Sequence, residues 1–101
     1  MSFRSDNSEV KDANGNIIEP NILIVDDDQI NIYVLGALLK KKNHRFDSAM
    51  NGAQAIEFVS KRINSPHRKM YNLIFLDFSM PDMDGPEVCI EIRKLVKEAN
   101  L

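Results

Sequence analysis

Two short apolar runs that each end in aspartate constrain the fold of this chain more than any other feature. Leu73–Leu76 is followed directly by Asp77, and Ile22–Val25 is followed by Asp26–Asp28. Four consecutive apolar residues are typical of a strand that is buried on both faces, as in a parallel sheet covered by helices. The carboxyl ends of parallel strands lie at one edge of the sheet, where open α/β folds bind their ligands. The two runs therefore predict one shared acidic pocket.

Helical patterns follow both runs. Apolar residues recur at helical spacing over three segments, residues 30–42, 53–63 and 86–99. Asp28 is a candidate N-cap of the first helix, and Pro86 suits the first position of the third. Residues 45–50 are expected to form a strand because they lie between two helices. The order βαβαβα predicts a parallel α/β sheet with flanking helices.

The first 20 residues have a different composition. They are rich in Ser, Asn, Asp, Glu and Lys, with almost no apolar content before Ile17-Ile18. Such a segment buries too little apolar surface to offset the entropy of ordering. Asn14-Gly15 suits a tight turn, but nothing before it resembles a strand. The sequence therefore predicts a disordered polar tail or linker at 1–20, followed by one domain at 21–101.

The totals exclude several classes of protein. With 101 residues and a net charge of −2, the chain holds one domain at most and has no general attraction to nucleic acid or anionic membranes. A single cysteine, Cys89, excludes an internal disulfide and fits a reducing compartment. No apolar run approaches the ~18–20 residues of a membrane span. We expect a cytoplasmic, intracellular domain without a nucleic-acid or membrane partner.

Asp26, Asp27 and Asp77 together indicate a metal site. Carboxylates that converge on one point repel one another and raise each other's pKa unless a cation is present. A few hard oxygen ligands that leave room for water favour Mg²⁺ over zinc or copper. A carboxylate beside Mg²⁺ can also act as a nucleophile and form an acyl phosphate. The structural alternative is that these aspartates start loops and cap helices, which is the favoured interpretation for Asp28.

Three stretches resemble the receiver domain of two-component response regulators, namely ILIVDDDQIN, MNGAQAI and LIFLDFSMPDMDG. The most specific part is an apolar strand, Asp, two residues, Met-Pro, two residues and then Asp-Gly. The resemblance covers residues 21 to about 97. It implies a flavodoxin-like parallel sheet with strand order 2-1-3 at its start.

The resemblance also implies roles for particular residues. Asp77 would be the phosphoacceptor, and Asp26 and Asp27 would match the acidic pair that binds Mg²⁺, with Asp27 the direct ligand and Asp26 acting partly through water. The backbone carbonyl of Ser79 would complete the metal shell, and Gly85 would take a backbone shape that other residues resist. The phosphoryl donor would be a histidine kinase or a histidine phosphotransfer domain. Such a domain is a signalling phosphoacceptor, which catalyses at most its own phosphorylation and dephosphorylation.

The chain departs from the family in one respect. Receivers have five βα units and only the first three are recognisable here, so the family's hydroxyl residue and phosphate-binding lysine would lie beyond Leu101. In the 2-1-3 order, the backbone of Leu73–Leu76 would form a bare edge of the sheet. We expect the chain to be marginally folded or to self-associate through this edge of the third strand of the domain.

Other functions stay open from the sequence. A non-phosphorylated interaction module, or an inactive receiver fragment, is the main alternative, because no lysine here can be assigned to phosphate binding. Asp26-x-Asp28 after an apolar strand also resembles the nucleophile motif of haloacid-dehalogenase-type phosphatases. That motif does not predict the Met-Pro…Asp-Gly loop and is the weaker alternative.

The remaining charged residues are expected to be solvated. His44 and His67 lie in polar basic stretches and are predicted to be loop residues that bind no metal. The basic residues should form a solvated face opposite the acidic end of the sheet: Lys40–Lys42, Lys61, Arg62, Arg68 and Lys69.

Overall fold

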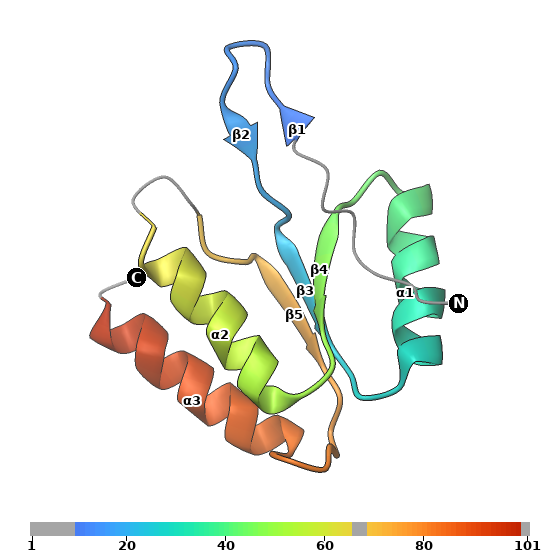
Figure 1. Cartoon of the computed structure of the whole chain (residues 1–101), viewed down its shortest axis with the longest axis vertical. Helices are drawn as coiled ribbons and strands as arrows, with labels where there is room; N and C mark the ends of the chain where they lie inside the picture. The colour runs from blue at the N-terminus through green and yellow to red at the C-terminus, as the bar shows by residue number, and fades with distance from the viewer. Residues whose placement is uncertain (1–9, 66–68, 100–101) are drawn as a thin grey trace.

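The computed structural model of the chain describes residues 10–65 and 69–99. Its elements follow one another in the order shown in Figure 1: β1 (Val10–Lys11), β2 (Ile17–Ile18), β3 (Ile22–Val25), α1 (Gln29–Lys41), β4 (Phe46–Ala49), α2 (Gly52–Ile63), β5 (Leu73–Leu76) and α3 (Gly85–Glu98). The predicted βαβαβα order is therefore present from β3 to α3, and the strand expected at residues 45–50 is β4.

A three-stranded parallel sheet with the order β4-β3-β5 forms the centre of the domain. Ile22 of β3 pairs with Phe46 of β4 on one side and with Leu73 of β5 on the other. The central position of β3 explains why its four consecutive apolar residues are all buried. This architecture confirms the predicted flavodoxin-like α/β fold class.

Helices cover the two faces of the sheet unequally, with α2 and α3 on one face and α1 on the other (Figure 1). Alternate residues of β3 point to opposite faces, so Leu23 joins the core under α2 and α3 while Ile24 joins the core under α1. The first core also contains Val59 of α2 and Val88 of α3. The larger core therefore lies on the face that two helices share.

The run in β5 is less buried than the sequence predicted. Leu73 keeps 47% of its surface exposed, and the other three residues of β5 are only half-buried. The reason is that β5 lies at the edge of the sheet and α1 sits on the far side of β3, against β4. Burial on both faces is correct for β3 and wrong for β5. The predicted self-association through this edge stays a prediction.

The helices begin where their polar caps stand. Asp28 accepts a hydrogen bond from the backbone of Ile30 at 2.9 Å, as expected of the N-cap of α1. Asn51 caps α2 by accepting from the backbone of Gln54 at 2.8 Å. Asp84 caps α3 in the same way, with Pro86 in the first turn.

The segment before the domain differs from the expected disordered tail. Residues 10–18 form an antiparallel hairpin of β1 and β2, with Val10 opposite Ile18. The physical reason is the turn, where the Asp12 carboxylate accepts from the backbone of Asn14 and of Asn16 at 2.9 Å and Gly15 adopts a φ of +84°. Local turn chemistry therefore orders a stretch that has little apolar content. Residues 1–9, the rest of the predicted tail, lie outside the described residues.

Within the described ranges, none of the helices combines the length and the apolar character needed to cross a membrane. The two-residue strands of the hairpin and the four-residue strands of the sheet complete the regular structure of these ranges.

Candidate functional site

The structure brings together the three aspartates that the sequence singled out. Asp26 and Asp27 follow β3, Asp77 follows β5, and the last residues of these neighbouring strands, Val25 and Leu76, are paired. One carboxylate oxygen from each aspartate lies within 4.8 Å of the other two. The expected acidic pocket at the carboxyl end of the sheet is therefore present as a geometric arrangement.

Backbone hydrogen bonds hold this end of the sheet. The amide of Asp77 donates to the carbonyl of Val25 at 2.8 Å, and the amide of Asp26 donates to the carbonyl of Ala49 at 3.1 Å. These bonds continue the ladder one residue beyond the strands on both sides of β3. The main chain at Asp26 and Asp77 is thus fixed by the sheet.

Asp26 is oriented by polar neighbours on the following turn. Its Oδ1 accepts from the backbone of Asp28 at 2.9 Å, and its Oδ2 accepts from the side-chain amide of Asn31 at 3.3 Å. Sequence reasoning missed Asn31, although its place in the first turn of α1, five residues after Asp26, puts it within reach of the strand end. Asp27, by contrast, is exposed.

The cluster makes ionisation of Asp27 less favourable. The pKa of Asp27 is raised above its ordinary value, first by desolvation and then by the hydrogen bond and charge of Asp77, with a further contribution from Asp26. Within residues 10–65 and 69–99, none of the three carboxylates forms an ion pair with a basic side chain. A cation would remove this repulsion.

The loop after Asp77 is closed tightly on itself. Met80 is 8% exposed and belongs to the core under α2 and α3, whereas Ser79 is exposed. The amide of Gly85 donates to the carbonyl of Phe78 at 2.9 Å, so the loop returns to its own start. The loop therefore keeps Ser79 near the carboxyl end of β5.

Gly85 is required by a close approach and has no left-handed backbone. Among the described glycines only Gly15 has a positive φ, which corrects the expectation of an unusual backbone shape at Gly85. A Cβ placed on Gly85 would collide with the carbonyl of Asp77 and lie 3.0 Å from the Cα of Phe78. Any side chain at this position would displace the backbone of the aspartate.

An open apolar groove of about 370 Å³ begins at the acidic cluster and runs between α1 and β5. Its apolar wall includes Val34, Leu38 and Phe75, and Asp26 and Asp77 stand at its end. Val34 and Leu38 keep more than half of their surfaces exposed, at 54% and 58%. The bare edge of β5 thus continues into an uncovered face.

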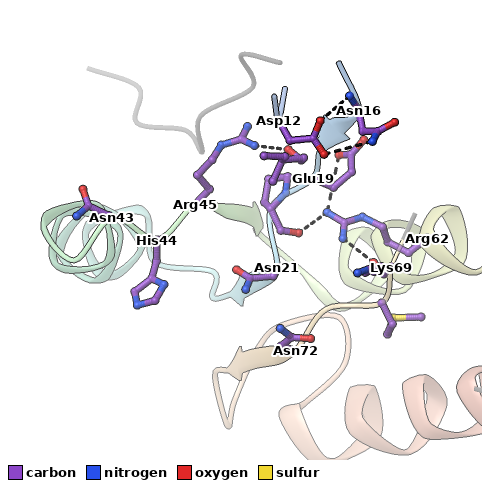
Figure 2. Close-up of a pocket in the computed structure, with 13 residues that line it drawn as sticks. Asp12, Asn16, Glu19, Asn21, Asn43, His44, Arg45, Arg62, Lys69 and Asn72 are labelled. Carbon is purple, nitrogen blue, oxygen red and sulfur yellow. Dashed lines mark hydrogen bonds and ion pairs between the residues drawn. The ribbon is translucent and has the colours of Figure 1, made fainter. Parts of the chain in front are cut away.

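A larger hollow of about 660 Å³ lies at the opposite, amino end of the strands, between the hairpin and the domain (Figure 2). Arg62 enters it from α2 with only 4% of its surface exposed, which corrects the prediction that this residue belongs to a solvated basic face. Its guanidinium donates to the carbonyl of Pro20 at 2.6 Å, to that of Lys69 at 2.9 Å and to the carboxylate of Asp47 at 3.1 Å.

The other basic residues of the predicted face behave as expected where they are described. Lys61 and Lys40 are exposed, and His44 is an exposed loop residue. His67 and Arg68 lie outside the described residues. Among the described residues, the amino end differs from the acidic cluster because the charge of Arg62 is paired with the carboxylate of Asp47.

Comparison with known proteins gives consistent results. Residues 22–100 match the family model described as the response regulator receiver domain. The chain is 40% identical over 80 residues to hybrid signal transduction histidine kinase L of Dictyostelium discoideum, covering 79% of this chain and 4% of that protein. It is 39% identical over 80 residues to the response regulator mcs4 of Schizosaccharomyces pombe, covering 78% of this chain and 14% of that protein.

Solved structures of similar fold include two receiver domains. The receiver domain of the histidine kinase CKI1 from Arabidopsis thaliana, complexed with Mg²⁺, matches with a TM-score of 0.73 at 30% identity, over 81% of this chain and 61% of that one. The receiver domain of Ssk1 from Saccharomyces cerevisiae, crystallised with the histidine phosphotransfer protein Ypd1, matches with a TM-score of 0.68 at 30% identity, over 81% and 52% of the two chains. The chain therefore spans about half to two thirds of these domains and a small part of the curated relatives.

Proposed function

Because this chain belongs to the family of response regulator receiver domains, we propose that it is a phosphoacceptor of a two-component phosphorelay. In this proposal Asp77 receives a phosphoryl group from a phosphohistidine, with Mg²⁺ bound beside it. The observation that carries the proposal is the convergence of three carboxylate oxygens, from Asp26, Asp27 and Asp77, within 4.8 Å at the carboxyl end of the sheet. Membership of the family also sets aside the dehalogenase-type alternative.

The donor set fits a magnesium ion. Three carboxylates from the ends of two strands provide hard oxygen ligands with a surplus of negative charge, and since Asp27 is exposed and the other two are only half-buried, there is room for water. Asp26, Asp27, Asp77 and the backbone carbonyl of Ser79 would hold the ion. When bound, Mg²⁺ would neutralise the charge that develops on the transferred phosphoryl group. The solved receiver domain of CKI1 with Mg²⁺ supports this assignment by similarity.

In the proposed reaction Asp77 would be the nucleophile, and neighbouring groups would hold Asp77 and Asp26 in position. A carboxylate oxygen of Asp77 attacks the phosphorus atom, the new O–P bond forms as the N–P bond to the donor histidine breaks, and the electron pair returns to the imidazole. The sheet holds the main chain of Asp77 through its 2.8 Å bond to Val25, which fixes the origin of the attacking side chain. Asn31 and the amide of Asp28 hold Asp26.

The partner proposed for this reaction is a histidine kinase or a histidine phosphotransfer domain. The similarity to hybrid histidine kinases and to the Ssk1 receiver crystallised with Ypd1 supports that class of donor. The cytoplasmic location expected from the sequence stays a prediction. The second candidate function is a non-phosphorylated interaction module, which the exposed apolar groove beside the acidic cluster favours.

A labelling experiment separates the two functions. The chain is incubated with a small phosphodonor or a phosphorylated histidine donor in Mg²⁺, and the label is located after digestion. We expect alkali-labile label on Asp77, as an acyl phosphate requires, and its loss in Asp77→Asn. Asp12→Asn is the matched control, because its carboxylate lies in the hairpin turn at the other end of the sheet. Label that resists alkali, or that survives in Asp77→Asn, would contradict the assignment.

A further inference from the structure

Asp82, a residue of the loop between β5 and α3, forms contacts that the proposed reaction does not explain. Its Oδ1 accepts from the backbone amide of Gly52 at 3.1 Å, and its Oδ2 accepts from that of Ala53 at 3.1 Å. Both donors belong to the first turn of α2, thirty residues earlier in the chain. These bonds lower the pKa of Asp82, the bond from Gly52 more than the bond from Ala53. Desolvation acts in the opposite direction but does not outweigh them.

The helix supplies its own cap without Asp82. Asn51 accepts from the backbone of Gln54 at 2.8 Å, and the side chain of Gln54 accepts from the backbone of Met50, the residue before the N-cap, at 2.8 Å, which resembles a capping box shifted by one residue. Only the first two amides of the helix are left for a partner from elsewhere, and Asp82 binds both. A carboxylate is well suited to this position, because the helix dipole adds to the attraction.

The contact between the loop and α2 is also close in packing terms. A Cβ on Gly52 would lie 2.9 Å from the Cβ of Met83 and 2.9 Å from a methyl group of Val88. The start of α2 therefore fits against the loop only because residue 52 is glycine. The hydrogen bonds of Asp82 lie beside this contact and fix the position of the loop relative to the start of α2.

We propose that Asp82 is a positioning residue of the acidic site. Its carboxylate ties the middle of the loop to the rigid end of α2, while Met80 is anchored in the core and Gly85 is bonded back to Phe78. Ser79, whose carbonyl is the proposed fourth protein ligand of Mg²⁺, lies between these fixed points. Asp82 thereby holds a metal ligand in place through the loop without contacting the metal. This inference rests on the proposed function.

The experiment measures Mg²⁺ affinity in three forms of the protein: the unmodified chain, Asp82→Ala and Asn51→Ala. Asn51→Ala is the matched control, because it removes a cap from the same helix end without touching the loop. We expect both variants to lower the thermal midpoint, whereas only Asp82→Ala weakens Mg²⁺ binding, by about tenfold, as is typical when an outer support of a metal ligand is removed. Titration with Mg²⁺ alone, followed through the amide shifts of residues 77–80, gives the affinity.

A second readout is independent of the metal. Hydrogen exchange at the amides of Gly52 and Ala53 should accelerate in Asp82→Ala and stay slow in Asn51→Ala. If Asp82→Ala does not fold, Asp82→Asn replaces it, since the amide keeps one acceptor and turns an NH₂ donor toward the other helix amide, and an intermediate loss of affinity is expected.

The outcomes separate the two hypotheses. If the unmodified chain binds Mg²⁺ at residues 26, 27 and 77 and Asp82→Ala binds it equally well, the positioning role is overturned and the proposed function stands. If Asn51→Ala weakens Mg²⁺ binding as much as Asp82→Ala, the effect is one of helix stability and the positioning role is again overturned. If the unmodified chain binds no Mg²⁺ there, both proposals fail.

Discussion

The two ends of the parallel sheet differ in how their charged side chains are arranged. At the carboxyl end, Asp26, Asp27 and Asp77 gather charges of one sign within 4.8 Å of one another. At the amino end, the guanidinium of Arg62 meets the carboxylate of Asp47 and two backbone carbonyls, and lies 4.0 Å from the centre of the Tyr71 ring. The first arrangement costs stability in the absence of a ligand, and the second is satisfied within the protein. The difference indicates which end binds a ligand and which end holds the fold together.

The paired charges of the amino end also link segments that are distant in sequence. Arg62 joins the segment before β3, the segment before β5 and the middle of β4. Tyr71 donates a hydrogen bond to the same carboxylate of Asp47, and burial followed by this bond raises the pKa of Tyr71. The hairpin is attached here as well, since Arg45 donates to the carbonyl of Ile18.

The largest expected effect on stability comes from removing the Arg62 side chain at the amino end of the sheet. Arg62→Met should destabilise the chain by about 3 to 5 kcal/mol, because it removes the positive charge beside a mostly buried carboxylate, which keeps only the Tyr71 hydroxyl as a donor, and removes the donor to two backbone carbonyls. Lys61→Met is the matched control, since the Lys61 side chain is 62% exposed, pairs with the exposed Glu57 and should change stability by less than about 1 kcal/mol. Urea unfolding followed by circular dichroism measures both. Equal effects of the two variants would show that the buried network contributes little.

The next prediction concerns the edge of β5, which runs between the two ends. Two copies can pair their β5 edges about a two-fold axis, which places the acidic end of each beside the other's amino end, where Lys40 and Lys41 close α1. We expect concentration-dependent dimers that salt weakens. Leu73→Lys, at 47% exposure on this edge, should weaken association by about tenfold or more, which corresponds to about 1.4 kcal/mol.

The control for this prediction is Ile90→Lys, which adds the same charge at an apolar residue of α3 that is 62% exposed and lies away from β5. Sedimentation velocity over a dilution series, at low and high salt, distinguishes the variants. Pairing through β5 would be contradicted if the unmodified chain stays monomeric at all concentrations. It would also be contradicted if Ile90→Lys weakens the dimer as much as Leu73→Lys does.

The sequence predicted the carboxyl end better than the amino end, for a physical reason. Asp26 and Asp77 directly follow apolar runs, so their position follows from the strand pattern and from parallel pairing alone. Arg62 lies in a stretch that reads as an amphipathic helix with a basic end, and its burial depends on three acceptors that come from elsewhere in the chain. The hydropathy pattern of a helix cannot reveal acceptors that distant segments supply.

The same limit explains the two other differences. The hairpin at residues 10–18 is specified by the side chain of Asp12, which the composition of the segment conceals. The role of Asp82 depends on the start of α2, which reaches the loop only in the folded chain. In contrast, Asp28 as the cap of α1 and Pro86 in the first turn of α3 act locally, and the sequence predicted both.

A smaller effect is expected at the carboxyl end. Asp77→Asn removes one of the clustered charges, so in the absence of metal it should raise the thermal midpoint by about 2 to 4 °C. Mg²⁺ should raise the midpoint of the unmodified chain and have little effect on the variant, because the ion then meets fewer carboxylates. Differential scanning calorimetry in chelator and in millimolar Mg²⁺ tests both statements. A lower midpoint for Asp77→Asn in chelator would show that the cluster is not under electrostatic strain.

The smallest effect is a difference in pH dependence between the two ends. The pKa of Asp27 is raised, first by desolvation and then by its contact with Asp77, so the metal-free folded chain holds this proton more tightly than the unfolded chain. The stability from this group is present below the unfolded pKa of about 3.9 and is lost as the pH rises through the folded value. The pKa of Asp12 in the hairpin turn is lowered, first by its backbone bond to Asn16, so its contribution is present above the unfolded pKa and is lost as the pH falls.

Asp27→Asn and Asp12→Asn should therefore change the pH profile of stability in opposite directions. The measurements are made in chelator between pH 3 and pH 7. The unmodified chain should lose the stability contributed by Asp27 as the pH rises, and Asp27→Asn should abolish this loss. The unmodified chain should gain the stability contributed by Asp12 as the pH rises, and Asp12→Asn should abolish this gain. Mg²⁺ should cancel the first effect, because a cation beside Asp27 favours its charged form, and should leave the second unchanged, because Asp12 lies in the hairpin at the other end of the sheet. Thermal midpoints of the three proteins, measured at half-unit steps of pH with and without Mg²⁺, give the slopes. If both substitutions change the slope in the same direction relative to the unmodified chain, the electrostatic distinction between the two ends is contradicted, since it requires that protons be held at one end and released at the other.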